Sequence, residues 1–208
     1  MKLLVTGAAG FIGARFVEAC QKKSYSIISV DEPSYFASRK EHSQINFGEI
    51  IDRSTLFDWL KEESPKLDGI VHLGACTDTT EMDEQYLTQM NLEYSKSIWT
   101  YASQNHIPLV YASSAATYGD GSLGYDDAES LISNLKPLNP YGESKRLFDL
   151  WALDQEKKGV NPPNWSAFKF FNVYGFGESH KEKMASVVLH AFEQIRKTGK
   201  VRLFKSHR

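Results

Sequence analysis

The chain has 208 residues, of which 41% are hydrophobic, and its 24 Lys or Arg against 26 Asp or Glu give a formal charge of −2. This composition is typical of one globular domain, or of one domain and part of a second, and excludes disordered and collagen-like chains. No apolar run approaches the roughly 20 residues that cross a bilayer, and the N-terminus reaches glycines too early for a signal peptide. Cys20 and Cys76 are too few for a disulfide framework or a four-ligand zinc site, so we expect a cytoplasmic protein with no metal and no membrane partner.

Short apolar and β-branched runs alternate along the chain with longer segments of helical periodicity. Strands are expected at residues 3–5, 27–30, 69–73, 107–111 and 166–171. Helices are expected around residues 11–17, 54–63, 83–105 and 141–158. Nearly all-apolar strands that alternate with helices predict a Rossmann-like α/β fold, in which a doubly wound parallel sheet carries helices on both faces.

Two segments depart from this alternation. The loop over residues 116–140 is long, and a loop of that length inside a compact domain is usually functional or mobile. After residue 171 the alternation stops, and a helix over 184–198 and a strand over 201–204 are expected. We therefore predict one domain over residues 1–171 and the incomplete beginning of a second, smaller domain over residues 172–208.

The charge is spread unevenly, because residues 181–208 hold eight Lys or Arg and only two Glu. Such a segment can meet nucleic acid, anionic lipid or a phosphorylated small molecule, or it can be a solvated helix face. The sequence has no basic patch interleaved with aromatic residues, so we expect no nucleic acid partner.

The first predicted strand runs directly into a glycine-rich turn with Gly7, Gly10 and Gly13. In a strand-to-helix turn, the first glycine allows the tight turn, the second lets the backbone approach a pyrophosphate, and the third lets the helix pack on the strand. The helix N-terminus then offers N–H groups to the phosphates. Asp31, at the end of the second strand, is placed to accept hydrogen bonds from the adenosine ribose, so the sequence predicts a dinucleotide site.

The choice between NAD and NADP stays open at this point. Asp31 favours NAD, because a 2′-phosphate would lie against its carboxylate. Arg39, Lys40 and Arg53 follow the second strand and are placed to reach a 2′-phosphate.

A second group of residues follows the later strands, where doubly wound sheets bind ligands. Ser114 is placed to bind a substrate hydroxyl or carbonyl, and Tyr141 and Lys145 share one helix face because they are four residues apart. A lysine ammonium near a tyrosine favours the phenolate, so we expect Lys145 to lower the pKa of Tyr141 and make it a general base.

Together these features resemble the extended short-chain dehydrogenase/reductase family, over essentially the whole chain. Within it the resemblance is greatest to the sugar-nucleotide epimerases that invert C6 of an ADP-heptose. The stretches that carry it are residues 74–81, 111–119, 136–141, 171–175 and 180–187. The last of these, His-Lys-x-x-Met-Ala-Ser-Val, is a much more specific motif than a glycine turn or a Tyr-x-x-x-Lys pair, which many sugar-nucleotide enzymes share.

The resemblance implies roles for residues that the spacing alone does not assign. NADP is the implied cofactor, and its contacts are Phe11, Ile12, Asp31, Glu32, Arg53, Leu73, Gly74, Ala75, Cys76, Thr77, Asn91, Lys145 and Val173. An ADP-heptose-type sugar nucleotide is the implied substrate, and its contacts are Ser114, Asn172, Lys183, His190, Phe204, Lys205, Ser206 and His207.

The implied reaction is a transient oxidation of the C6 hydroxyl by bound NADP, rotation of the aldehyde, and return of the hydride to its other face. It serves synthesis of the lipopolysaccharide inner core. Inversion calls for an acid/base on each side of the carbonyl, and the resemblance assigns Tyr141 and Lys181. Two departures from the family pattern concern contacts: family members often have a small hydroxyl side chain in place of Lys183, and Glu32 adds negative charge near any 2′-phosphate.

Two other functions remain open. The first is another sugar-nucleotide epimerase, dehydratase or reductase, such as a UDP-glucose 4-epimerase; Ala115 and Ala116 after Ser114 argue against a 4,6-dehydratase, which typically has an acidic pair there. The second is a dinucleotide-sensing module without catalysis, although such proteins usually lose the tyrosine or the lysine. Assembly into a homo-oligomer is compatible with the sequence, which indicates no interface.

Overall fold

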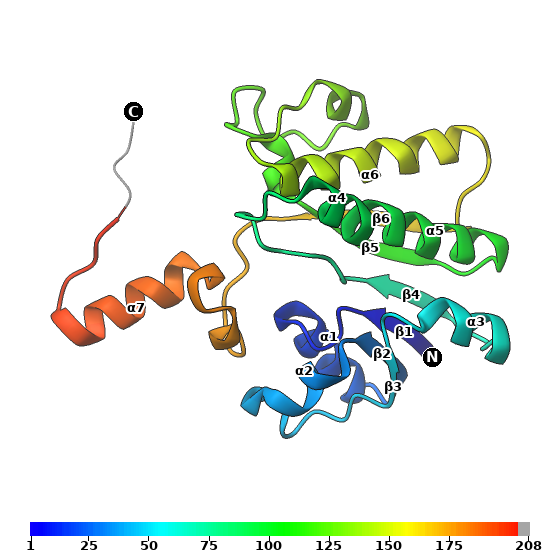
Figure 1. The fold of residues 1–208 in the computed structure, drawn as a ribbon, viewed down its shortest axis with the longest axis horizontal. Helices are drawn as coiled ribbons and strands as arrows, with labels where there is room; N and C mark the ends of the chain where they lie inside the picture. The colour runs from blue at the N-terminus through cyan, green and yellow to red at the C-terminus, as the bar shows by residue number, and fades with distance from the viewer. Residues whose placement is uncertain (204–208) are drawn as a thin grey trace. The chain divides into compact units, whose positions relative to one another are not determined.

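A six-stranded, wholly parallel sheet forms the centre of the computed structural model, which describes residues 1–203 (Figure 1). The strand order is β3-β2-β1-β4-β5-β6, and it reverses direction between β1 and β4. The strands are β1 (Lys2–Thr6), β2 (Ser26–Asp31), β3 (Glu49–Asp52), β4 (Gly69–His72), β5 (Leu109–Ser114) and β6 (Trp165–Phe170). In open parallel sheets, ligands bind at the carboxyl ends of the strands at such a reversal.

Helices connect the strands in the expected alternation, and α6 packs against both β5 and α5 (Figure 1). The helices are α1 (Phe11–Gln21), α2 (Pro33–Ser38), α3 (Leu56–Glu63), α4 (Glu84–Leu87), α5 (Tyr94–Gln104), α6 (Pro140–Lys157) and α7 (Val187–Thr198). A π-helical turn, Thr88–Glu93, joins α4 to α5, and 3₁₀ turns cover Lys40–His42, Ala115–Tyr118, Glu129–Asn134 and Ser179–Met184.

Both faces of the sheet are buried, as the nearly all-apolar strands predict. Leu3 and Val5 of β1 pack with Val17 of α1, whereas Leu4 packs on the opposite face with Trp99 of α5. Successive side chains of a strand point to opposite faces, so a run of three apolar residues supplies two cores at once. The predicted Rossmann-like fold is confirmed.

Some elements differ from those expected. Strand β3 is not expected from the sequence. It lies at the edge of the sheet and its first two residues are exposed, so it has no long apolar run that would indicate a strand. The helix expected over 83–105 is divided by the π-helical turn. No strand forms at 201–203, contrary to expectation, and residue 204 of that predicted strand lies outside the described residues.

The chain separates into two compact units, residues 1–171 and residues 172–208. The first holds the sheet, and the described part of the second holds a 3₁₀ turn and α7. That the second unit begins a substrate domain stays a prediction. Within residues 1–203, no helix is both long and apolar enough to cross a membrane.

Candidate active site

The glycine turn after β1 is built so that only glycines fit at two of its positions. Gly7 has φ +67°, and a Cβ there would lie 2.6 Å from the backbone nitrogen of Gly74. A Cβ on Gly13 would overlap the carbonyl oxygen of Gly7. Gly10 caps α1 and has no side chain to accept from the first helical turn, so a phosphate can take that place.

Asp31, the last residue of β2, bonds the backbone of this turn. Its carboxylate is 9% exposed and accepts hydrogen bonds from the backbone N–H groups of Ala9, at 3.0 Å, and Glu32, at 2.9 Å. A carboxylate has about four acceptor positions, so these two bonds leave capacity for ribose hydroxyls.

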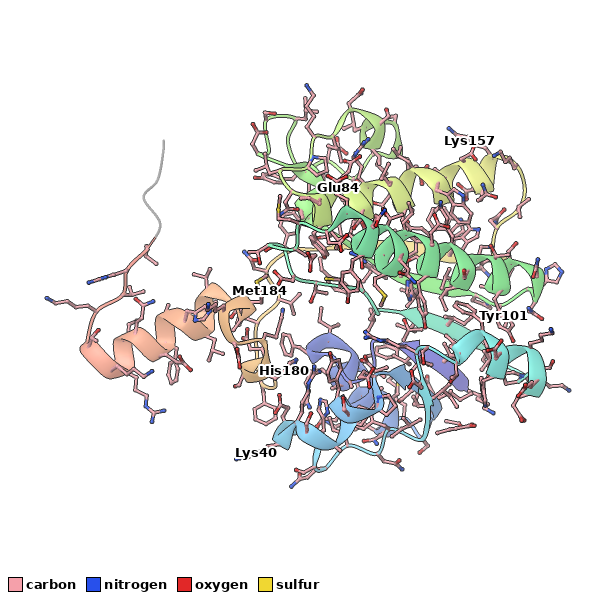
Figure 2. The ribbon with its side chains drawn as sticks, in the orientation of Figure 1. Lys40, Glu84, Tyr101, Lys157, His180 and Met184 are labelled. Atoms are coloured by element: carbon pink, nitrogen blue, oxygen red, sulfur yellow. The ribbon has the colours of Figure 1, made fainter. Side chains whose placement is uncertain are left out.

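Two arginines from different segments lie close to Asp31. The Arg39 guanidinium donates to the carbonyl of Ala9 and lies 4.5 Å from the centre of the Tyr35 ring. Burial lowers the pKa of Arg39, and the negative charge of Asp31 opposes that shift. Arg53 lies 3.9 Å from Glu32, and Lys40, labelled in Figure 2, begins the 3₁₀ turn beside Arg39. The predicted cationic residues therefore gather around the end of β2.

The loop after β4, which starts at Leu73, lies beside the glycine turn because β4 pairs with β1. Asn91 brackets this loop: its Oδ1 accepts from the Cys76 N–H at 2.8 Å, and its Nδ2 donates to the Cys76 carbonyl at 3.0 Å. Nδ2 also lies 3.0 Å from Ser144 Oγ on α6. Asn91 is wholly buried and supports the loop through these contacts, and its contact with the cofactor stays a prediction.

A buried hydrogen-bonded chain that the sequence analysis did not identify runs beneath this loop. Thr6 Oγ1 lies 2.6 Å from His72 Nδ1, and His72 Nε2 lies 2.8 Å from Ser95 Oγ. The Ser95 hydroxyl donates its one proton to the carbonyl of Asn91, so it can only accept from the ring of His72. His72 Nε2 therefore donates to Ser95, and His72 Nδ1 accepts from the Thr6 hydroxyl. Burial, and then the charge of Lys145, lower the pKa of His72 to about 3, so the imidazole is neutral.

Tyr141 lies in the first turn of α6, close to Ser114 at the end of β5. Asn139 caps the helix by accepting from the Gly142 N–H at 2.8 Å. A Cβ on Gly142 would lie 2.8 Å from the carbonyl oxygen of Ala116, so this glycine lets α6 approach the turn after β5. The Tyr141 hydroxyl shares a hydrogen bond with that of Ser114.

Lys145 follows Tyr141 by one turn and is buried, and its Nζ donates to the Ala112 carbonyl at 3.0 Å. Burial lowers the pKa of Lys145 to about 8, against the opposing charges of Asp149 and Cys76. Burial also raises the pKa of Tyr141, although the bond to Ser114 lowers it. The expected lowering of the Tyr141 pKa by Lys145 is therefore not found in this structure: burial has the largest effect and raises the pKa, and the group that lowers it is Ser114.

The other predicted residues belong to the second unit, so their approach to Tyr141 stays a prediction. Asn172 and Val173 open that unit, and Lys181 and Lys183 lie in the 3₁₀ turn between the labelled His180 and Met184 (Figure 2). His190 lies on α7. The predicted substrate contacts Phe204, Lys205, Ser206 and His207 lie outside the described residues.

Glu178 organises the segment that carries Lys181, and the sequence analysis did not identify it. Its carboxylate accepts from the Gly175 N–H at 2.9 Å, the Ser186 N–H at 2.6 Å and the Ser186 hydroxyl at 3.0 Å. Burial raises the pKa of Glu178, but these bonds and the charge of Lys181 together bring it below its ordinary value. No sequence pattern in the segment after β6 marks this carboxylate.

Comparisons with known proteins agree with this geometry. Two curated ADP-L-glycero-D-manno-heptose-6-epimerases, from Fusobacterium nucleatum and Nitratidesulfovibrio vulgaris, are each 41% identical to the chain, over 99% and 98% of its length. The chain spans 63% and 62% of these relatives. The crystal structure of the Helicobacter pylori ADP-L-glycero-D-manno-heptose-6-epimerase matches 98% of this chain, and 66% of its own, with a TM-score of 0.79 and 26% identity.

More distant structures share the fold. A UDP-N-acetylglucosamine 4-epimerase from Methanobrevibacter ruminantium matches 98% of this chain, and 64% of its own, with a TM-score of 0.77 and 22% identity. Residues 3–208 match the sequence profile of the NAD dependent epimerase/dehydratase family, which confirms the expected kinship with extended short-chain dehydrogenases/reductases. Because this match covers nearly the full length of the chain, the chain belongs to the NAD dependent epimerase/dehydratase family.

Proposed function

We propose that this chain carries the cofactor-binding and catalytic part of an ADP-heptose 6-epimerase, which converts ADP-D-glycero-D-manno-heptose to ADP-L-glycero-D-manno-heptose for lipopolysaccharide synthesis. The observation that carries the proposal is the buried Tyr141, which is bonded to Ser114 and followed by Lys145. This group and the glycine turn both lie at the carboxyl ends of the strands. The 41% identity to heptose epimerases favours this substrate over UDP-sugars. A cytoplasmic location belongs to the proposal, and the free thiols of Cys20 and Cys76 are compatible with it.

NADP is the cofactor we propose within this NAD-dependent family. The glycine turn fits a dinucleotide, because Gly10 gives the N-terminus of α1 no side-chain cap and so leaves that place for a phosphate. Arg39 and Arg53 near Asp31 supply the positive charge that a 2′-phosphate needs, with Lys40 next to them. The test is the dinucleotide that copurifies with the full-length protein: NAD alone would contradict the choice of NADP.

Each residue of the proposed site has one task. When bound, the nicotinamide supplies a reversible hydride acceptor for the carbinol carbon of the sugar. Tyr141 Oη exchanges the proton of the reacting hydroxyl, and Ser114 orients that hydroxyl. Lys145 holds the nicotinamide ribose, and it lies buried one helical turn from Tyr141. Lys181 is the proposed acid/base for the opposite face of the sugar carbon.

The experiment compares Tyr141→Phe with the natural full-length protein, using ADP-D-glycero-D-manno-heptose and UDP-glucose as substrates. We expect turnover of the ADP-heptose alone, and a loss of at least ~100-fold in the variant with cofactor binding retained, because only the acid/base hydroxyl is removed. Near-normal turnover by the variant would show that Tyr141 is not the base. Turnover of UDP-glucose alone would favour the alternative, a UDP-sugar 4-epimerase.

A further inference from the structure

An ion pair between Asp149 and Lys169, which the proposed mechanism does not use, lies one helical turn beyond Lys145. Lys169 Nζ of β6 is 2.8 Å from Asp149 Oδ2 of α6, and the two side chains are 12% and 3% exposed. The carboxylate also accepts from the Tyr111 hydroxyl at 3.0 Å and from Ser113 Oγ at 2.7 Å. A carboxylate this deeply buried is costly without such partners, so the arrangement is specific.

The helix places this carboxylate on the catalytic face. Tyr141, Lys145 and Asp149 are spaced four residues apart on α6, so they share one side of the helix. Strand β5 packs against that side of α6. The side chains of Tyr111 and Ser113 donate to Asp149, and the backbone carbonyl of Ala112 between them accepts from Lys145. Asp149 and Lys145 are thereby held against successive residues of one strand.

The other member of the pair reaches the turn that carries Ser114. Lys169 Nζ donates to Thr117 Oγ1 at 2.9 Å and lies 5.4 Å from the centre of the Tyr118 ring. Thr117 Oγ1 in turn donates to the Ser114 carbonyl at 2.8 Å. Through Thr117, the ion pair is connected to the backbone of the residue that bonds Tyr141.

We propose that Asp149 and Lys169 are positioning residues for the reaction: Asp149 is the counter-charge that keeps the buried Lys145 cationic, and Lys169 limits that charge while it fixes the Ser114 turn. The kinetic consequences rest on the proposed function. The placement of the pair does not, because it is a property of residues 1–171.

The charges around Lys145 give the proposal a directional consequence. The groups that interact with Lys145 electrostatically are Asp149 on α6, His72 on β4 and Cys76 after β4. Tyr141 precedes Lys145 by one turn of α6, and Tyr111 on β5 and Lys169 on β6 bond Asp149. Among these, Asp149 and Cys76 raise the pKa of Lys145 against its burial. Neutralising Asp149 removes a stabilising negative charge, whereas neutralising Lys169 leaves that charge uncompensated. The two changes therefore move the titration of Lys145 in opposite directions.

The test measures kcat and kcat/KM from about pH 6 to about pH 10 for Asp149→Asn and Lys169→Met in the full-length protein. Activity that needs the Lys145 ammonium falls as the pH rises through its pKa. We expect this alkaline limb to move about one pH unit lower in Asp149→Asn and higher in Lys169→Met. Asp154→Asn is the matched control, because it neutralises an exposed, lysine-paired aspartate of the same helix and leaves the profile unchanged. Lys169→Arg is expected to restore the natural profile.

A second readout separates this proposal from the proposed function. Nuclear magnetic resonance of labelled lysine side chains follows the Lys145 titration directly, with Lys145→Arg to assign its signal, and needs no substrate. Opposite shifts in the two variants support the proposal even if the ADP-heptose is not turned over. Shifts in the same direction, or no shift, overturn it, and if Asp149→Asn does not fold, the direction in Lys169→Met decides.

Discussion

His72 is a neutral imidazole whose tautomer is fixed by both of its neighbours. Thr6 donates to Nδ1 and Ser95 accepts from Nε2, so a proton added at Nδ1 would break the first bond and place a charge in a buried position. Through Ser95 and Asn91, this imidazole supports the Cys76 loop. Its protonation state is thus coupled to the folded structure rather than to proton transfer in the reaction.

We predict that His72 makes the fold sensitive to acid. Its pKa is about 3 in the folded protein and about 6.5 when unfolded, so between these values the unfolded state binds the extra proton. The free energy of unfolding then falls as the pH drops below about 6.5, by up to ~1.4 kcal/mol per pH unit. Urea unfolding at about pH 7 and about pH 5 measures this loss, which we expect to be smaller in His72→Gln. An equal loss in both proteins would assign the acid sensitivity to other groups.

At the scale of elements, the close contact between α1 and the turn after β1 depends on one missing side chain. A Cβ on Gly13 would overlap the Gly7 carbonyl, and the neighbouring Ala8 Cα would lie 2.9 Å away, so the helix or the turn would have to move. Both carry the groups that we expect to meet the pyrophosphate. The turn and the helix therefore act as one unit in cofactor binding.

Gly13→Ala is accordingly expected to weaken dinucleotide binding by at least ~10-fold, because the helix N-terminus and the turn no longer fit together. Titration with NADPH followed by its fluorescence, or with NADP followed by calorimetry, measures this. Gly69→Ala is the control and is expected to keep the affinity, since its Cβ would meet the end of the Leu3 side chain at 3.3 Å and the Pro108 carbonyl oxygen at an ordinary 3.7 Å. Unchanged affinity in Gly13→Ala would show that the turn tolerates the displacement.

The elements that local spacing determines were predictable from the sequence. Tyr141 and Lys145 share a helix face because of helical periodicity, and the glycine turn is fixed by the positive φ of Gly7 and the close contact at Gly13. The Asp149–Lys169 pair joins residues 20 positions apart, and the packing of α6 on β5 and the pairing of β5 with β6 bring them together. The neutral His72 and the raised Tyr141 pKa likewise depend on burial, which spacing does not reveal.

At the scale of the whole molecule, the two units carry different parts of the proposed function. Both hydrophobic cores lie within residues 1–171, and so do the glycine turn, Asp31 and the Ser114–Tyr141–Lys145 group. The second unit holds the predicted Lys181 and His190, on a segment that Glu178 organises internally. We therefore expect nearly all of the cofactor contacts to lie in the first unit.

We predict that residues 1–171 alone fold and bind NADP with an affinity within about fivefold of the whole protein, because a unit with its own cores folds independently and only Val173 among the predicted cofactor contacts is lost. A single cooperative unfolding transition and an NADP titration measure this. Arg39→Ala in the shortened chain is the control and is expected to lose affinity for NADP, not NAD, because Arg39 is one of the cations that we expect to face the extra phosphate. A shortened chain that folds without binding NADP would place essential cofactor contacts in the second unit.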